Sequence, residues 1–198
     1  PIEMTQELAI EKGLKVDKNW FDEAFKKHQE LSRAWAEQKF AWGLADNSET
    51  TTALHTATHL MLAWLRKVLG NHVHQAWSNI TAERLRFDFT HPDKVTPEQL
   101  SEVEAYVNQA ISSNATMILD QIKKVDAQND ETIEASFWEK YPETVKVYTL
   151  KDAAGVVYSR ELCGWPHVEN TSTMWTFKIQ KEEASSRWVR RIKAVLIK

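Results

Sequence analysis

Two histidines four residues apart, His55 and His59, lie in the stretch LHTATHLMLAWLRKVLG. In an α-helix this spacing places both imidazoles on one face, one turn apart, where they can bind a single ion. Cys163 and His167 repeat the spacing in ELCGWPHVEN. Three imidazoles and one thiolate form a soft to borderline ligand set that suits tetrahedral zinc. The two pairs therefore favour a zinc site, and a structural thiol beside core histidines is the alternative.

The first histidine pair needs a helix, and the surrounding sequence predicts one. Ser48 or Asn47 is expected to cap this helix, and Gly70 to end it. One face carries apolar residues at helical spacing, which we expect to face a core: Leu54, Ala57, Met61, Leu65 and Val68. The histidines then lie on a neighbouring stripe of the same helix.

Three further helices are predicted from caps and apolar spacing. Residues 5–12 suggest a short helix, and a longer one is expected from a cap at Asp17 or Asn19 to about Glu37. The stretch TPEQLSEVEAYVNQAISSNATMILDQIKKV begins with Thr96 as a cap and a proline at the first helical position, so we predict one helix along it.

Several short runs predict β-strands. Residues 72–80 and 83–90 are expected to pair as a hairpin, because apolar and polar residues alternate in LRFDF. Four β-rich runs follow, VKVYTL, GVVYSREL, TMWTFKIQKE and VRRIKAVLI. Helices and strands are partly segregated, which favours the α+β class. The second ligand pair lies between two of these runs.

Composition limits the function classes. The net charge of -3 disfavours a globally basic nucleic-acid binder, although residues 178–198 hold seven Lys or Arg against two Glu. A solvated strand face is the simpler interpretation of that basic segment. The single cysteine excludes an internal disulfide and favours a reducing compartment. No apolar run approaches the roughly 18 residues of a membrane span and no leader opens the sequence, so we expect a cytoplasmic protein without membrane contact.

Over nearly its whole length the sequence resembles the editing domain of alanyl-tRNA synthetases. The resemblance rests on HTATHLMLAWLRKVLGNHVHQAWSNITAERLRFDFTH, and further along on CGWPHVENTSTMWTFKI and VRRIKAV. PIEMTQELAIEKGLKVD and the helix after it resemble the end of the tRNA-recognition region that precedes editing in that family. The resemblance implies a helical segment at residues 1–40 and an editing domain at residues 41–198. The expected editing domain contains zinc and a mainly antiparallel sheet packed on long helices.

The activity implied by this resemblance is hydrolysis of the ester that joins a wrong amino acid, serine or glycine, to tRNA(Ala). A synthetic pocket sized for alanine cannot exclude glycine and rejects serine weakly, so a second, hydrolytic site is needed. The class II aminoacylation core is absent from the sequence, so this chain is not expected to charge tRNA. Its expected partners are the acceptor end of tRNA(Ala) and, for a fragment, the remainder of the synthetase. A free-standing editing deacylase and a non-catalytic zinc- or tRNA-binding module are the alternatives.

Individual roles follow from the same resemblance. The residues that match the family's zinc ligands are His55, His59, Cys163 and His167. Thr58 and Gln75 match pocket positions, where a hydroxyl and an amide can hydrogen-bond the serine side chain or the attacking water, although a helix-face threonine is by default a packing residue. Zinc can polarise the ester, activate water or position the terminal adenosine. Phosphate contacts are expected from Arg84, Arg86, Arg190 and Arg191.

Tryptophan and glycine are present in unusual amounts. The chain has nine tryptophans and 5 glycines, whereas average usage predicts about 14 glycines. The resemblance places glycine where the sequence has Trp42, Trp77, Trp165, Trp175 and Trp188; Trp35 and Trp138 fit the same pattern, and Trp20 and Trp64 are compatible with it. We hypothesise that UGA codons encode glycine in the source and are rendered here as tryptophan. Between Cys163 and His167, where glycine can take positive φ, an indole is expected to disturb the metal geometry.

Overall fold

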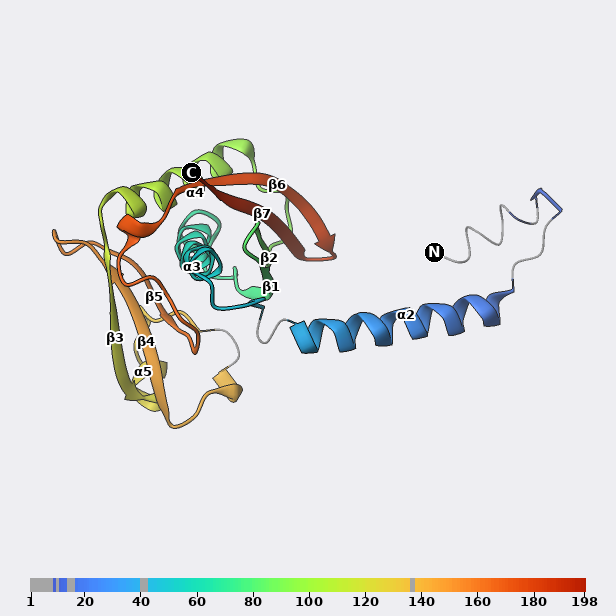
Figure 1. The fold of residues 1–198 in the computed structure, drawn as a ribbon, viewed down its shortest axis with the longest axis horizontal. Coiled ribbons are helices and arrows are strands. Elements are labelled where there is room, and N and C mark those ends of the chain that lie inside the picture. The colour runs from blue at the N-terminus through green and yellow to red at the C-terminus, as the bar shows by residue number, and fades with distance from the viewer. Residues whose placement is uncertain (1–8, 10, 14–16, 40–42, 136–137) are drawn as a thin grey trace. The chain divides into compact units, whose positions relative to one another are not determined.

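The computed structural model describes residues 9, 11–13, 17–39, 43–135 and 138–198 (Figure 1). Two compact units divide the chain, Pro1–Ala41 and Trp42–Lys198. The first unit contains helix α2 (Lys18–Lys39), which confirms the longer predicted helix to within two residues of its end. Most of the short helix predicted at residues 5–12 lies outside the described residues.

Helix α3 (Glu49–Leu69) carries the first histidine pair. Ser48 is its N-cap and accepts a hydrogen bond from the backbone N–H of Thr51, and Gly70 ends it with a φ of 116°. These are the predicted boundaries. Four of the five apolar residues predicted to face a core are buried, and Val68 is half-buried.

The single helix predicted from Thr96 onward is wrong in its second half. Helix α4 (Pro97–Ser112) begins with a capping box formed by Thr96 and Gln99. Just past its end, Asn114 adopts a left-handed φ of 53°, a common way to terminate a helix. The chain continues as strand β3 (Thr116–Lys123) and a short helix α5 (Lys124–Gln128).

The strands form two sheets, and every pairing between named strands is antiparallel. The four-stranded sheet has the order β1–β2–β7–β6, with bounds Gln75–Ile80, Leu85–Thr90, Val189–Ile197 and Thr176–Ser186. The three-stranded sheet has the order β3–β4–β5, in which β4 is Thr144–Lys151 and β5 is Val157–Leu162. Two 3₁₀ turns complete the fold, η1 (Trp138–Lys140) and η2 (Thr171–Thr173). The predicted hairpin, the four β-rich runs and the α+β class are confirmed.

Helix α3 packs against both sheets. It contacts β5 of the three-stranded sheet and β1 and β2 of the four-stranded sheet, while α4 contacts α3 and β6 (Figure 1). The largest buried side chains include Phe87 and Phe89 on β2 and Phe177 on β6. None of the described helices combines the length and apolar composition needed to cross a membrane. The histidine pair on α3 is therefore held in the core, beside the strand that leads to Cys163.

Candidate metal centre

The four predicted ligands converge between α3 and the end of β5. His55 and His59 project from α3 with exposed fractions of 6% and 8%, and Cys163 and His167 lie in the connection between β5 and η2. One ligand atom from each residue lies within 4.8 Å of all the others. The Nε2 atoms of His55 and His59 are 3.2 Å apart, and Cys163 Sγ is 3.5 Å from His55 Nε2. The fold thus brings together residues more than a hundred positions apart.

Hydrogen bonds around the centre assign the tautomers of two histidines. His55 Nδ1 lies 3.0 Å from the carbonyl oxygen of Pro166, which can only accept, so Nδ1 carries the proton. His167 Nδ1 lies 3.2 Å from the hydroxyl of Thr56, whose own proton is donated to Thr52 O. Thr56 therefore accepts from His167. Both rings direct an unprotonated Nε2 toward the other ligands.

The protonation of the remaining groups follows from burial and charge. Burial lowers the pKa of His59, but the carboxylate of Glu161, 2.8 Å from Nδ1, and Cys163 together raise it to about 10. Burial raises the pKa of the Cys163 thiol, yet the surrounding histidines, with the positive charge of His59 among them, hold it well below its usual range. Burial and the positive charge of His59 lower the pKa of His167 to about 3. A thiolate and a neutral imidazole are the forms that bind metals, so His59 releases a proton when an ion binds.

An unpartnered atom shows that a cation fits this donor set. His167 Nε2 is buried and has no hydrogen-bond partner in the described part of the chain. A buried polar atom without a partner is unfavourable, and a cation among the four ligand atoms would bind its lone pair. The set of three imidazoles and one thiolate matches the preference of zinc. The cluster can therefore hold a metal ion, and zinc as its identity stays a prediction.

A cavity of about 350 Å³ adjoins the centre. Three of the ligands line it, together with both predicted pocket residues, Thr58 and Gln75. Thr58 is 3% exposed, and its hydroxyl donates to Leu54 O at 2.8 Å, so the hydroxyl oxygen can still accept. Gln75 Nε2 donates to the Ser78 hydroxyl at 3.4 Å. The structure brings the predicted ligands and pocket residues into one site, although their roles remain predictions.

Sequence reasoning missed several polar residues of this cavity. Glu134 and Glu161 both line it, and Glu134 accepts from Arg66 at 2.9 Å. Burial raises the pKa of Glu134 despite that positive charge. Tyr141 also lines the cavity, and burial raises its pKa to about 12. The available signal was the spacing of Glu161, two residues before Cys163, which is weak because the strand VYSREL shows no alternation of apolar and polar residues that would mark Glu161 as buried.

The sequence is similar to aminoacyl-tRNA synthetases over nearly all of its length. Residues 145–193 match the family model of the threonyl and alanyl tRNA synthetase second additional domain. The chain is 55% identical to an alanine–tRNA ligase of Treponema denticola in an alignment of 201 positions that covers 99% of the chain. The chain belongs to the alanine–tRNA ligase family. An alanine–tRNA ligase of Treponema pallidum is 49% identical over 100% of the chain, and one of Petrotoga mobilis is 41% identical over 74%.

The family match covers only part of the longer relatives. The chain spans 32% of the length of each of the two Treponema alanine–tRNA ligases, and the match to the Petrotoga protein covers 16% of that protein. The matched model at residues 145–193 contains Cys163 and His167, whereas the histidines of α3 lie outside it. The geometry of the centre therefore links α3 to the matched domain.

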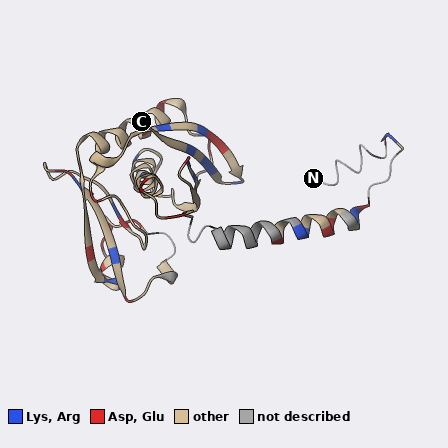
Figure 2. Cartoon of the chain, viewed as in Figure 1, with Lys and Arg blue, Asp and Glu red and all other residues tan. Residues whose placement is uncertain are grey.

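The four arginines predicted to contact tRNA do not line the cavity and lie on or beside the four-stranded sheet: Arg84, Arg86, Arg190 and Arg191. Figure 2 shows basic and acidic segments side by side on β6 and β7. Arg191 makes two hydrogen bonds of 2.7 Å to Asp88 on the adjacent strand. Arg190 donates to Glu182 at 2.6 Å. These two guanidinium groups are held by carboxylates of the same domain, while the predicted tRNA contacts remain untested.

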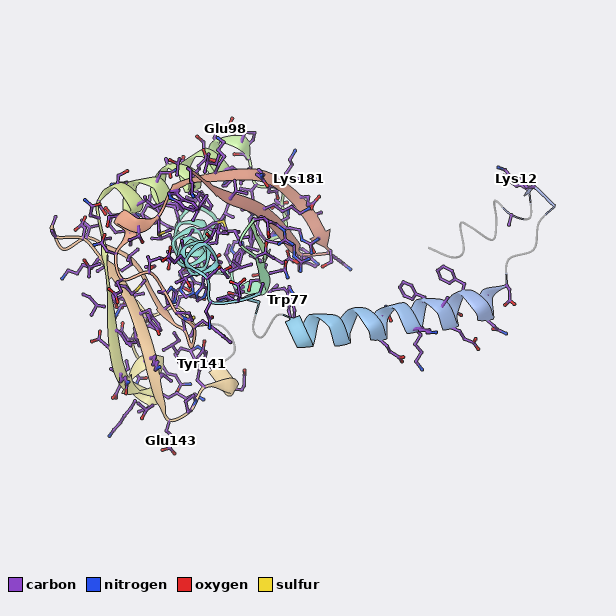
Figure 3. All side chains as sticks on the ribbon, in the orientation of Figure 1. Lys12, Trp77, Glu98, Tyr141, Glu143 and Lys181 are labelled. Carbon is purple, nitrogen blue, oxygen red and sulfur yellow. The ribbon has the colours of Figure 1, made fainter. Side chains whose placement is uncertain are left out.

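The tryptophans differ sharply in their surroundings. Among the described residues, Trp188 and Asn114 are the only ones other than glycine with positive φ. Trp188 has a φ of 66° and is 59% exposed. Trp77 on β1 is 53% exposed (Figure 3). Trp165 lacks positive φ and packs against the core, and the four ligands converge with its indole present. The ligand atoms therefore converge without a glycine at position 165, and the expected effect of Trp165 on the geometry of a bound metal stays a prediction. Trp42 and the side chains of Trp20 and Trp35 fall outside the description.

Proposed function

We propose that this chain carries the editing activity of an alanine–tRNA ligase. The reaction is hydrolysis of the ester between serine or glycine and the terminal ribose of tRNA(Ala). Water adds to the ester carbonyl carbon, the bond from that carbon to the ribose oxygen breaks, and the ribose oxygen takes a proton. The observation that supports this proposal is the cavity that joins His55, His59 and Cys163 to the polar groups of Thr58 and Gln75.

The metal is proposed to be zinc, held by His55, His59, Cys163 and His167. When bound beside the cavity, zinc supplies a Lewis acid for the ester carbonyl or for water. The chain's own contribution is to fix the ligands before the ion arrives. The backbone carbonyl of Pro166 and the hydroxyl of Thr56 orient two of the three imidazoles.

Thr58 is proposed to select serine over alanine. Because its hydroxyl proton is donated to Leu54 O, its oxygen offers an acceptor to the serine hydroxyl. An alanyl group would leave that buried acceptor without a partner, which costs about 1–3 kcal/mol. This difference corresponds to roughly 5- to 150-fold in rate. Gln75, whose amide has both donors and an acceptor, is proposed to bind the substrate or the attacking water.

The test is single-turnover deacylation of seryl-, glycyl- and alanyl-tRNA(Ala) by the chain and by Thr58→Val. Valine keeps the shape but removes the hydroxyl, so the rate on the seryl ester should fall by roughly 5- to 150-fold relative to the alanyl ester. The ratio of the glycyl to the alanyl rate should stay constant. An unchanged ratio of the seryl to the alanyl rate would return Thr58 to a packing role.

Thr171→Val is a matched control for this variant. Thr171 is also buried and donates its hydroxyl to a backbone carbonyl, Ala110 O, at 2.9 Å, but it does not line the cavity. Both variants lose the same type of hydrogen bond. Only Thr58→Val should change the ratio of the rates on the three esters. Absence of deacylation by the unmodified chain on all three esters would contradict the proposed function.

A further inference from the structure

Glu161 is buried at the end of β5, two residues before a proposed metal ligand. Its exposed fraction is 6%, and Oε2 lies 2.8 Å from His59 Nδ1. Its other oxygen, Oε1, is buried and has no hydrogen-bond partner among the described residues. A buried carboxylate is unfavourable unless a charge or hydrogen bond compensates for it. His59 compensates one oxygen of this carboxylate, and the other oxygen is left without a partner.

The other two histidines are oriented by neutral groups. His55 donates to the carbonyl of Pro166, and His167 donates to the hydroxyl of Thr56. His59 alone among the three has a carboxylate on Nδ1. A carboxylate acceptor fixes the proton on Nδ1, turns Nε2 toward the centre and makes the imidazole a stronger base.

Charge gives the carboxylate a second role. A divalent ion held by one thiolate and three neutral imidazoles keeps one excess positive charge. The centre is largely buried between α3, β5 and the connection after it, where an uncompensated charge is disfavoured. One carboxylate within hydrogen-bond distance of a ligand cancels that excess. Glu161 supplies it, and the other described acidic residue of the cavity, Glu134, is already paired with Arg66.

We propose that Glu161 is the positioning residue of the metal centre, which orients His59 and neutralises the bound divalent ion. This inference rests on the proposed metal site and goes beyond the ligand set. It assigns a function to a residue that does not itself bind the ion. It also explains why a carboxylate with an unpartnered oxygen is placed inside the domain.

The experiment measures zinc affinity by competition with a chelator for the chain, Glu161→Gln and Glu161→Ala. Glutamine can still accept from His59 Nδ1 but has no charge, so affinity should fall about 10-fold. Alanine removes both the charge and the acceptor, so the loss should approach about 100-fold. Cobalt substitution gives a second measurement, because the thiolate-to-cobalt absorption of the Glu161→Gln variant should persist at saturating metal and show that Cys163 still binds.

Glu182→Gln is the matched control. Glu182 is also a buried carboxylate with one oxygen in an ion pair, here with Arg190, and the other unpartnered, but it lies on the four-stranded sheet. The zinc affinity of Glu182→Gln should stay within about 2-fold of that of the parent chain. This change is well under the loss expected when a group beside a ligand is replaced. Equal affinities for the parent and both Glu161 variants would overturn the positioning role while the metal site stands. A parent chain that binds no zinc would overturn the metal site and this role together.

Discussion

The metal centre and the arginine-bearing sheet were both predicted as functional regions, and they differ in what their polar groups contact. At the centre, ring nitrogens and a thiolate point at one another, and His167 Nε2 has no partner among the described residues. On the sheet, Arg191 and Arg190 are bound by Asp88 and Glu182. A buried group with an unused lone pair can bind a ligand, whereas a group already paired must first exchange its partner. The variants that follow test this difference.

The largest effect is expected for Cys163→Ala. This change removes the only thiolate, so zinc affinity should fall by more than about 100-fold, beyond the effect of changing a group that merely supports a ligand. The turn at residues 162–168 should also lose stability, since metal binding and folding are coupled. Metal analysis after dialysis measures the occupancy. His91→Ala, in the surface pair of His72 and His91, should keep full occupancy. Full occupancy in Cys163→Ala would remove that residue from the ligand set.

A smaller effect is expected on the arginine-bearing sheet. Arg191→Gln removes the guanidinium that makes two hydrogen bonds to the carboxylate of Asp88. The Asp88 side chain is only 8% exposed. The free energy of unfolding, measured with urea, should fall by about 1.5–3 kcal/mol. The dependence of tRNA affinity on salt should hardly change, because the guanidinium is already neutralised within the domain.

Arg84, in the connection between β1 and β2, provides the contrast to Arg191. Its guanidinium donates to Asn79 O at 2.9 Å, and no ion pair involves it within the described residues. Arg84→Gln should therefore leave the free energy of unfolding nearly unchanged and lower the slope of log affinity against log salt by about 1. A slope that falls for Arg191→Gln and not for Arg84→Gln would reverse this assignment of the phosphate contact.

The smallest effect is expected at the turn between β6 and β7. Ser186 pairs with Val189, so Trp188 occupies the second position of a two-residue connection with φ 66°. A left-handed residue other than glycine costs about 1–2 kcal/mol, and glycine returns part of this through its greater freedom in the unfolded chain. Trp188→Gly should therefore raise the free energy of unfolding by about 0.5–1 kcal/mol.

Trp77→Gly is the control for the turn variant. Trp77 is similarly exposed but lies within β1 without positive φ, so glycine should lower the free energy of unfolding by about 0.5–1 kcal/mol. The opposite signs separate a backbone effect from the loss of an exposed indole. Mass spectrometry of the protein from its source, or the codons of its gene, tests whether these residues are glycine. UGG at every tryptophan position would exclude recoding.

The sequence predicted the parts of the fold that depend on local signals. The caps at Ser48 and Thr96 and the alternation in β2 were sufficient for α3, the start of α4 and the first hairpin. Strand β3 was missed because its residues also suit a helix. The signal that ends α4 is Asn114 with positive φ, a residue type that often occupies this position.

The metal ligands were predictable from the sequence, whereas the acidic residues that contact or surround them were not. Two pairs at a spacing of four residues are visible in the sequence, and so are a threonine and a glutamine at positions that match a family pocket. Glu161 on β5 and Glu134 in the segment between α5 and η1 acquire meaning only when both are brought against α3. The pairing of Arg191 with Asp88 likewise depends on the register of β2 and β7, more than a hundred residues apart.

The convergence of α3 with the connection after β5 has a consequence for how the chain folds. Cys163 and His55 are 108 residues apart, so an ion bound by both closes a very long loop. For a covalent crosslink over a loop of about 100 residues, the chain-entropy model gives about 4–5 kcal/mol of stabilisation through the unfolded state. A bound ion would act as a reversible crosslink of that kind between α3 and the connection after β5. Chelation should then lower the temperature of unfolding, which calorimetry with and without a chelator would measure.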